Sequence, residues 1–194
     1  IKAGREDLAL LTELVGKQLR INGEPFLIKG VIPSFSQAFT NLPLAQGFQQ
    51  LKRLGANTLR FYHAATDSIT REAEKAGLLF IDQPDASTWD NVDIRSVGDR
   101  EMLEQSYFEL RNKSRSSPSS LMNLVGNELE LGLDPAVGKR WLSRVVGSLR
   151  HRLPSNEILA YATHGIHPEY PVNVHAVNML VTGRHFWGVG LEWL

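Results

Sequence analysis

Short apolar stretches alternate with longer amphipathic stretches along most of this 194-residue chain. Residues 57–62 are expected to form a short strand, and residues 67–76 follow it with helical spacing until Gly77. This rhythm is typical of parallel strands that are joined by right-handed helical crossovers. The alternation therefore predicts an α/β fold, and periodicity alone leaves open whether the sheet is open or closed.

The pair Asn22-Gly23 marks the first expected element, because Asn-Gly between alternating apolar residues favours a two-residue hairpin turn. The arms of this hairpin are expected at residues 18–21 and 24–31. The later strands are expected at residues 57–62, 78–82, 121–125, 157–162 and 174–179, and the helices at residues 44–54, 67–76, 99–114 and 135–152.

Polar residues gather at the carboxyl ends of the expected strands, where barrel proteins carry their chemistry. An open doubly wound sheet would instead concentrate its ligand contacts at one switch point, and no Gly-rich phosphate loop follows the first expected strand. We therefore expect a (β/α)8 TIM-type barrel with about six strand–helix units visible. The strand-end residues are Arg60, His63, Asp82, Asp85, Asn127, Glu128, His164 and Asn178.

The expected domain organisation is a lead-in at residues 1–17 followed by one barrel domain at residues 18–194. A complete barrel typically needs roughly 250 residues, and the chain starts without Met. We expect it to be a fragment of a longer chain, with further domains as partners.

The amino-acid composition limits the kinds of molecule that the protein is expected to bind. Lys plus Arg and Asp plus Glu number 21 each, so no charge excess points to nucleic acid. No uncharged apolar stretch reaches the length of a membrane span in this segment. The chain has 0 cysteines, which removes thiolate nucleophiles and Cys-based metal sites. We expect a carbohydrate substrate, no metal and no cofactor, and no cellular compartment follows.

Glu128 follows an apolar strand and Gly126, beside the Asn127 amide. A general acid needs such a place, where a partly buried carboxyl meets a group that orients the substrate. The alternative is structural: Glu128 would simply cap the segment that follows.

Four segments, in this order, resemble the catalytic barrel of glycoside hydrolase family 2, the β-galactosidase and β-glucuronidase group. They are residues 19–31, 54–60, 77–82 and the triplet Gly126-Asn127-Glu128. The resemblance is close over about residues 18–130 and thins beyond them. It implies retaining hydrolysis of a β-linked glycoside or oligosaccharide by double displacement.

The resemblance also implies roles for single residues. Glu128 is expected to be the acid/base, and Asn127 is expected to contact the sugar 2-hydroxyl. Arg60 would support the carboxylates, or would form a buried ion pair instead. His63 would face the substrate, or would be an ordinary hydrogen-bonded loop residue.

Further substrate contacts are expected from Asp82, Trp89, His164 and Asn178. The Trp89 ring would either stack on a sugar or anchor its loop. The histidine at the end of the fifth strand, His164, would line a sugar pocket or be satisfied in the core.

Retaining hydrolysis also needs a nucleophilic carboxylate roughly 5–5.5 Å from the acid. The late candidate is Glu192, which follows the apolar run at residues 189–191. It comes only 14 residues after Asn178, which is short for a helical crossover and another strand. Either a shortened connection brings Glu192 round as the nucleophile, or the last barrel strands lie outside this chain.

Two departures from the family pattern favour a protein without catalytic activity. Ile32 stands where a polar residue is usual, and Gln83 stands where an acidic residue is common. A catalytically inactive barrel, kept as a carbohydrate-binding or assembly domain of a larger protein, is therefore an alternative. A transglycosylase, which passes the same covalent intermediate to a sugar acceptor, is another.

Overall fold

A computed structural model describes residues 10–33, 43–84, 92–129, 133–164, 171–180 and 187–192. The chain divides into two compact units. The first holds Ile1–Phe61, Ala65–Ile81 and Arg111–Leu121, and the second holds Tyr62–Ala64, Asp82–Leu110 and Met122–Leu194. The described strands are β1 (Thr12–Val15), β2 (Gln18–Ile21), β3 (Glu24–Pro25), β4 (Gly30–Val31), β5 (Thr58–Arg60), β6 (Leu79–Asp82), β7 (Ser120–Asn127), β8 (Ala160–His164), β9 (Val174–Leu180) and β10 (Trp187–Glu192). The described helices are α2 (Leu44–Arg53), α3 (Asp67–Ala76), α4 (Val97–Ser114) and α5 (Pro135–Arg152).

The predicted hairpin is confirmed around Asn22-Gly23, although its second arm is shorter than expected. Asn22 and Gly23 both have positive φ, at 52° and 85°, as a two-residue hairpin turn requires. The residues of β3 in register with β2 end at Pro25, and the Phe26 N–H makes one further bond to the Leu19 carbonyl at 2.9 Å. The rest of the expected arm forms β4, which pairs in parallel with β5. β1 pairs antiparallel with β2 and lies inside the expected lead-in.

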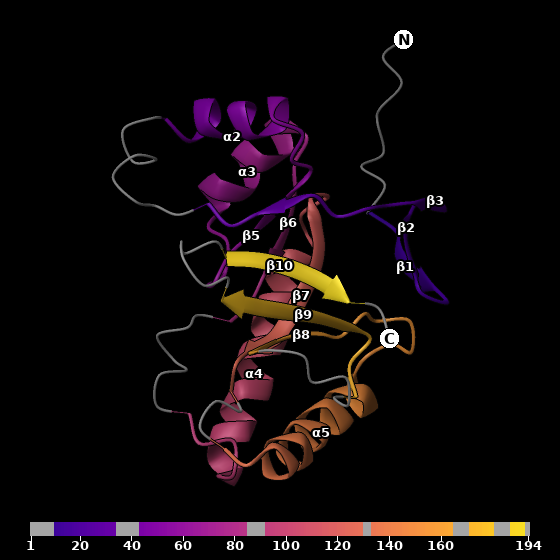
Figure 1. Cartoon of the computed structure of the whole chain (residues 1–194), viewed down its shortest axis with the longest axis vertical. Helices are drawn as coiled ribbons and strands as arrows, with labels where there is room; N and C mark the ends of the chain where they lie inside the picture. Colours follow the sequence, from indigo (N-terminus) through magenta and orange to yellow (C-terminus); the bar gives the residue numbers. More distant parts are fainter. Residues whose placement is uncertain are drawn as a thin grey trace. The chain divides into compact units, whose positions relative to one another are not determined.

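In the first unit, β4, β5 and β6 pair in parallel, and α2 and α3 cover one face of them (Figure 1). The core joins Phe48 from α2, Ile69 from α3, Leu59 from β5 and Phe80 from β6. Helix α3 has the predicted bounds because Thr66 caps its first turn and Gly77, at φ 65°, ends it in the left-handed region.

Asn57 joins the start of β5 to the segment before β4. Its amide donates to the Leu27 carbonyl at 2.8 Å, and its side-chain oxygen accepts from the Lys29 N–H at 2.7 Å. These bonds satisfy backbone groups where the strand ladder has not yet begun.

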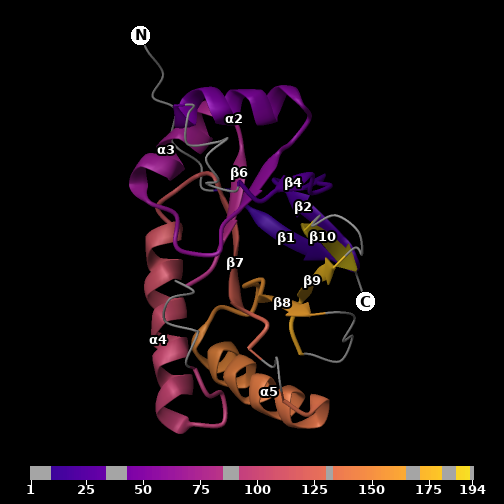
Figure 2. The same ribbon diagram turned by 60° about the vertical axis from the view of Figure 1, so that its left-hand side comes forward.

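In the second unit, β7, β8 and β9 pair in parallel, and the two long helices α4 and α5 lie side by side (Figure 2). Their apolar faces meet the strands in a second core, to which Tyr107 of α4, Leu149 of α5, Val125 of β7 and Tyr161 of β8 contribute. Asp134 caps α5 and Pro135 occupies its first turn, so this helix also has the predicted bounds.

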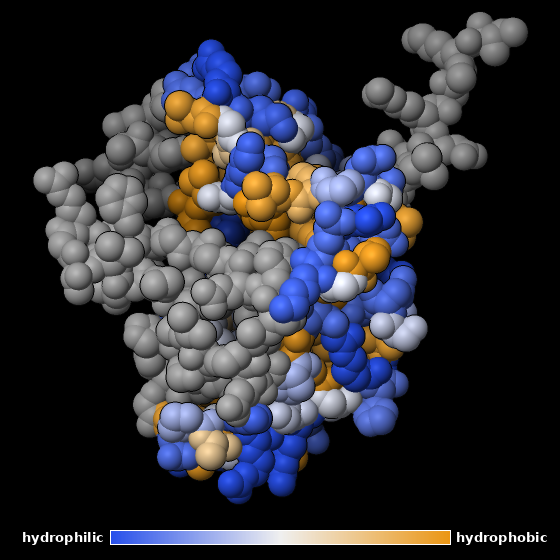
Figure 3. Space-filling view, turned by 45° about the vertical axis from the view of Figure 1, so that its right-hand side comes forward, coloured by the Kyte–Doolittle hydropathy of each residue, from blue (hydrophilic) through white to orange (hydrophobic). Residues whose placement is uncertain are grey.

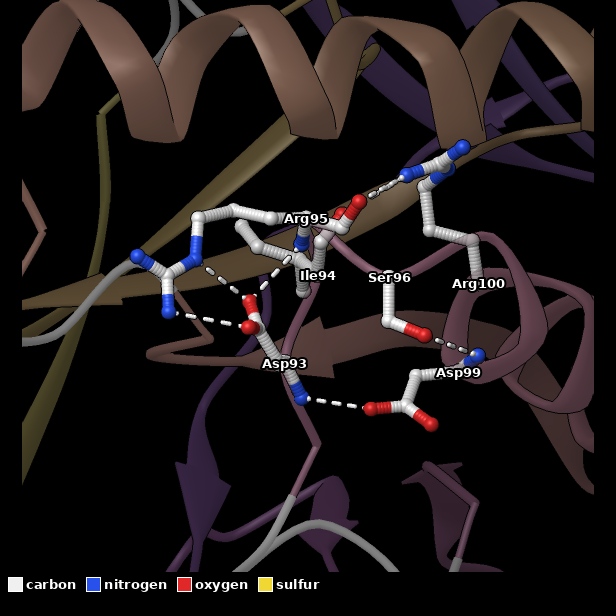
Figure 4. A network of polar contacts seen from close by, with 6 residues as sticks. All are labelled: Asp93, Ile94, Arg95, Ser96, Asp99 and Arg100. Atoms are coloured by element: carbon white, nitrogen blue, oxygen red, sulfur yellow. Dashed lines mark hydrogen bonds and ion pairs between the residues drawn. The ribbon is translucent and has the colours of Figure 1, made fainter.

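A polar network organises the entry to α4 (Figure 4). The Asp93 carboxylate accepts from the backbone N–H, Nε and Nη2 of Arg95, and the Asp93 N–H donates to Asp99 at 2.9 Å. Ser96 accepts from the Asp99 N–H at 3.3 Å, and so caps the helix. Arg100 donates to the carbonyls of Ile94 and Arg95.

The expected (β/α)8 barrel is wrong for this chain. The seven-stranded sheet has the order β10-β9-β8-β7-β6-β5-β4, so β4 and β10 are its two edges and the described residues form an open sheet. β10 runs antiparallel to β9 because residues 181–186 are too few for a helical crossover of about a dozen residues. The sequential strand order of β4 to β9 also differs from the switched order of a doubly wound sheet.

The surface is mixed in polarity. Over the described part of the face in Figure 3, hydrophobic residues are interspersed with hydrophilic ones. Leu27 and Leu54 are exposed, as single apolar side chains often are. None of the described helices is both long enough and apolar enough to cross a membrane.

Candidate functional site

The candidate site is built on the carboxyl end of β7. This strand is buried from Leu121 to Gly126, and its apolar side chains pack on both faces, as a central parallel strand requires. At Asn127 the burial becomes partial, and Glu128 follows directly with its side chain half-buried. An amide and a carboxyl therefore stand together where the strand ends.

Glu128 has an unusual backbone conformation, with φ at 52°. In the left-handed region the Cβ atom crowds the following carbonyl oxygen, so residues other than Gly, Asn and Asp rarely adopt it. Strained backbone of this kind occurs at functional sites when neighbouring groups hold it in place.

Two hydrogen bonds to β8 hold the backbone on either side of Glu128. The Glu128 N–H donates to the Ala162 carbonyl at 2.8 Å. The Leu129 N–H donates to the Tyr161 hydroxyl at 2.7 Å. Tyr161 is fully buried, so the turn after β7 is anchored to the core of the second unit.

Asp82, at the end of β6, lies in the same unit and is 2% exposed. Its carboxylate accepts a bond from the Asn123 side-chain amide of β7 at 2.6 Å. Asn123 is itself 6% exposed, so this is a buried amide–carboxylate pair, and burial strengthens such a bond.

Arg60 and His63 occupy the predicted strand end and loop start. Arg60 ends β5 in the first unit and is buried. His63 is half-buried, and its Nδ1 lies 3.0 Å from the Ala64 carbonyl oxygen, so it makes a local contact in its own loop. Their roles toward a substrate stay predictions.

Three further predicted residues, His164, Asn178 and Glu192, belong to the last three strands of the sheet. His164 ends β8 and is in register with Asn178 of β9. Glu192 ends β10 and is in register with His175, near the start of β9. The antiparallel course of β10 thus carries Glu192 toward the end of the sheet where β9 begins, and its role as nucleophile stays a prediction. Trp89 lies outside the described residues.

Two residues at this site have roles that the sequence did not reveal. Asn123 is a polar residue inside an apolar strand, and that was a signal for a buried hydrogen-bond partner. The hydrogen bond between Tyr161 and Leu129 depends on the pairing of β7 with β8, which no local sequence pattern shows.

Chemically, the end of β7 offers one half-buried carboxyl beside one amide. A carboxyl group can donate a proton and later accept one, and an amide can orient a hydroxyl group. This pair is suited to acid/base work on a polar substrate such as a sugar.

Comparison with solved structures shows that the fold is like that of glycoside hydrolases. Three similar structures are bacterial β-glucuronidases. One is β-glucuronidase 2 of Bacteroides uniformis, covalently bound to cyclophellitol-6-carboxylate aziridine, with a TM-score of 0.64 and 19% identity over 88% of this chain and 23% of that chain. The second is the Ruminococcus gnavus enzyme in complex with uronic isofagomine, with a TM-score of 0.63 and 17% identity over 88% of this chain and 32% of that chain. The third, from Bifidobacterium dentium, is complexed with coumarin-3-O-glucuronide and has a TM-score of 0.65 and 16% identity over 88% of this chain and 30% of that chain.

The likeness concerns the fold and only a section of these proteins. The chain spans between 23% and 32% of the length of the three structures. No protein-family model matches the sequence, and no curated protein matches it either.

Proposed function

We propose that this chain carries the acid/base carboxyl of a retaining β-glycoside hydrolase, and that Glu128 is this carboxyl. The observation that carries the proposal is the half-buried Asn127-Glu128 pair at the end of β7, whose backbone is held in a strained conformation by β8. The likeness of the fold to bacterial β-glucuronidases supports it.

The reaction proceeds by double displacement. Glu128 protonates the departing glycosidic oxygen while a second carboxylate attacks the anomeric carbon, so the sugar becomes covalently bound. Glu128, now ionised, takes a proton from a water molecule as its oxygen attacks the anomeric carbon. The bond between the sugar and the second carboxylate breaks, which releases the sugar and restores that carboxylate. Asn127 donates a hydrogen bond to the sugar 2-hydroxyl, and Asp82, His63, His164, Asn178 and Trp89 complete the substrate contacts.

The first substrate class to test is the β-glucuronides. The Ruminococcus gnavus structure contains uronic isofagomine, and the Bifidobacterium dentium structure contains coumarin-3-O-glucuronide. An aryl β-glucoside is the comparison substrate, because it is the same sugar with a hydroxymethyl group at C6 in place of the carboxylate.

The test of Glu128 uses substrates with different leaving groups. Glu128→Gln should lower turnover of a β-glycoside with a poor leaving group by about 10²–10⁴-fold, since only such a leaving group needs a proton. Turnover of an activated aryl glycoside should fall far less in its first step. Glu101→Gln, on the exposed face of α4, is the matched control and should leave both rates unchanged. Equal rates for Glu128→Gln and Glu101→Gln would remove Glu128 from the acid role.

The nucleophile is either Glu192 or a carboxylate outside this chain. A cyclophellitol-type aziridine, which labels nucleophilic carboxylates covalently, separates the two. Peptide mass mapping that finds the label on Glu192 would assign the nucleophile there, and Glu192→Gln should then abolish labelling.

A sugar-binding or assembly domain without turnover is the second candidate function. The register of Glu192 with His175, near the start of β9, favours it. It predicts binding of a β-glycoside by calorimetry with no release of the leaving group. If turnover does occur, product analysis separates hydrolysis, which yields free sugar, from transglycosylation, which yields longer saccharides.

A further inference from the structure

The conformation of Glu128 requires support from its surroundings. A Glu residue at φ 52° is disfavoured relative to the ordinary strand or helix conformations, so the turn would relax if nothing opposed it. The direction of the Glu128 side chain depends on this conformation, because the Cα–Cβ bond rotates with φ.

Two bonds flank the Cα atom of Glu128, one on each peptide group. The bond from the Glu128 N–H to Ala162 fixes the peptide before it, and therefore φ. The bond from the Leu129 N–H to Tyr161 fixes the peptide after it, and therefore ψ. The first bond joins two main-chain groups, so no side-chain substitution removes it. The second ends on a side chain, and a single hydroxyl group supplies it.

Tyr161 is a rigid support. It is fully buried in β8 and belongs to the core cluster of the second unit. Leu129 packs its side chain against the same cluster, so its amide reaches the Tyr161 hydroxyl from a residue that is itself held. Apolar packing around the ring leaves the hydroxyl little freedom to move.

We propose that Tyr161 is a positioning residue, whose hydroxyl holds Glu128 in its left-handed conformation and so directs its carboxyl. The catalytic consequence rests on the proposed function of Glu128. The structural consequence does not, because it concerns the backbone of residues 128–129 alone.

The test compares Tyr161→Phe with Tyr107→Phe in the full chain. Both variants lose one hydroxyl from a fully buried ring of the same core cluster, and only Tyr161 accepts the Leu129 bond in the described structure. Amide hydrogen exchange measured by NMR reports the bond directly. In Tyr161→Phe the Leu129 amide should exchange about fivefold faster relative to amides of β8, the factor expected for one ordinary hydrogen bond. In Tyr107→Phe the relative rate should not change.

Steady-state kinetics gives the second measurement. Tyr161→Phe should lower kcat for an aryl β-glycoside by about tenfold with KM within about twofold, since the acid is misdirected while sugar contacts remain. Tyr107→Phe should retain the wild-type kcat. Equal kcat values in the two variants, in an active protein, would overturn the positioning role.

The two proposals fail in different ways. An absence of turnover in the wild-type chain contradicts the hydrolase, while amide exchange still decides whether Tyr161 holds the turn. Unchanged exchange of the Leu129 amide in Tyr161→Phe overturns the inference even if the wild-type chain hydrolyses glycosides.

Discussion

At the scale of the residue, Glu128 is where side-chain identity and backbone conformation disagree. Its φ of 52° suits glycine, yet the position carries a long charged side chain. The sequence pattern placed Glu128 after a buried strand and beside Asn127, which the structure bears out in the bounds of β7. The strain itself was beyond the sequence, because it arises from the bonds that β8 makes with this turn.

The strain predicts a difference between two truncations of Glu128. Glu128→Gly and Glu128→Ala lose the same carboxyl, but only alanine keeps the Cβ atom that is unfavourable at positive φ. The glycine variant should be more stable than the alanine variant by about 1 kcal/mol in free energy of unfolding. Urea denaturation of both variants measures this difference. Equal stabilities would mean that the turn carries no strain.

At the scale of the element, helix boundaries were the most predictable feature, because their signals lie within a few residues. Gly77 ends α3 as expected, whereas the cap of α3 is Thr66 and not Asp67, the residue that the sequence suggested. The capping of α5 by Asp134 is seen only in the structure. The second arm of the hairpin was less predictable. Its alternating pattern continues past Pro25, and only the pairing of β4 with β5 shows that the strand changes sheets there.

Helix α5 offers a test of local capping energy. The Asp134 carboxylate accepts from the N–H groups of Ala136 and Val137 at 3.0 and 3.2 Å. Asp134→Ala should lower the free energy of unfolding by about 1 kcal/mol, whereas Asp134→Asn keeps a capping oxygen and should cost much less. Thermal and urea denaturation of the pair measure the difference, and equal losses would contradict the capping role.

The entry to α4 predicts a pH dependence. The side-chain hydrogen bond from Arg95, followed by its backbone hydrogen bond, lowers the pKa of Asp93 below its ordinary value of 3.8. A carboxyl with a depressed folded-state pKa stabilises the fold above pH 3.8 and loses this contribution as the pH falls through the folded-state pKa. Asp93→Asn lacks it at every pH. The gap in urea midpoint between wild type and Asp93→Asn should therefore be largest near neutral pH and close in acid, and a constant gap would refute the linkage.

At the scale of the whole molecule, closure of the sheet was the property that the sequence misjudged. Strand-end residues such as Asp82, Asn127 and Asn178 suit a barrel, and the sequential order of β4 to β9 agrees with one. Closure, however, requires the first and last strands of the sheet to pair with each other. That pairing is not encoded within any one element. The short segment after β9 decided it by returning β10 as an antiparallel strand. Substrate contacts that come from several strands were equally hard to predict from the sequence, because each contact depends on where distant segments of the chain lie.

The left-handed turn at Glu128 has a consequence for evolution. Mutation and drift remove a costly side chain wherever selection does not retain it. Relatives that keep the chemistry should keep glutamate at this position, and relatives that have lost it should accumulate glycine or asparagine there sooner than at the relaxed positions of the same strand. The residue found at this position in a set of relatives would thus indicate which of them still use the carboxyl group.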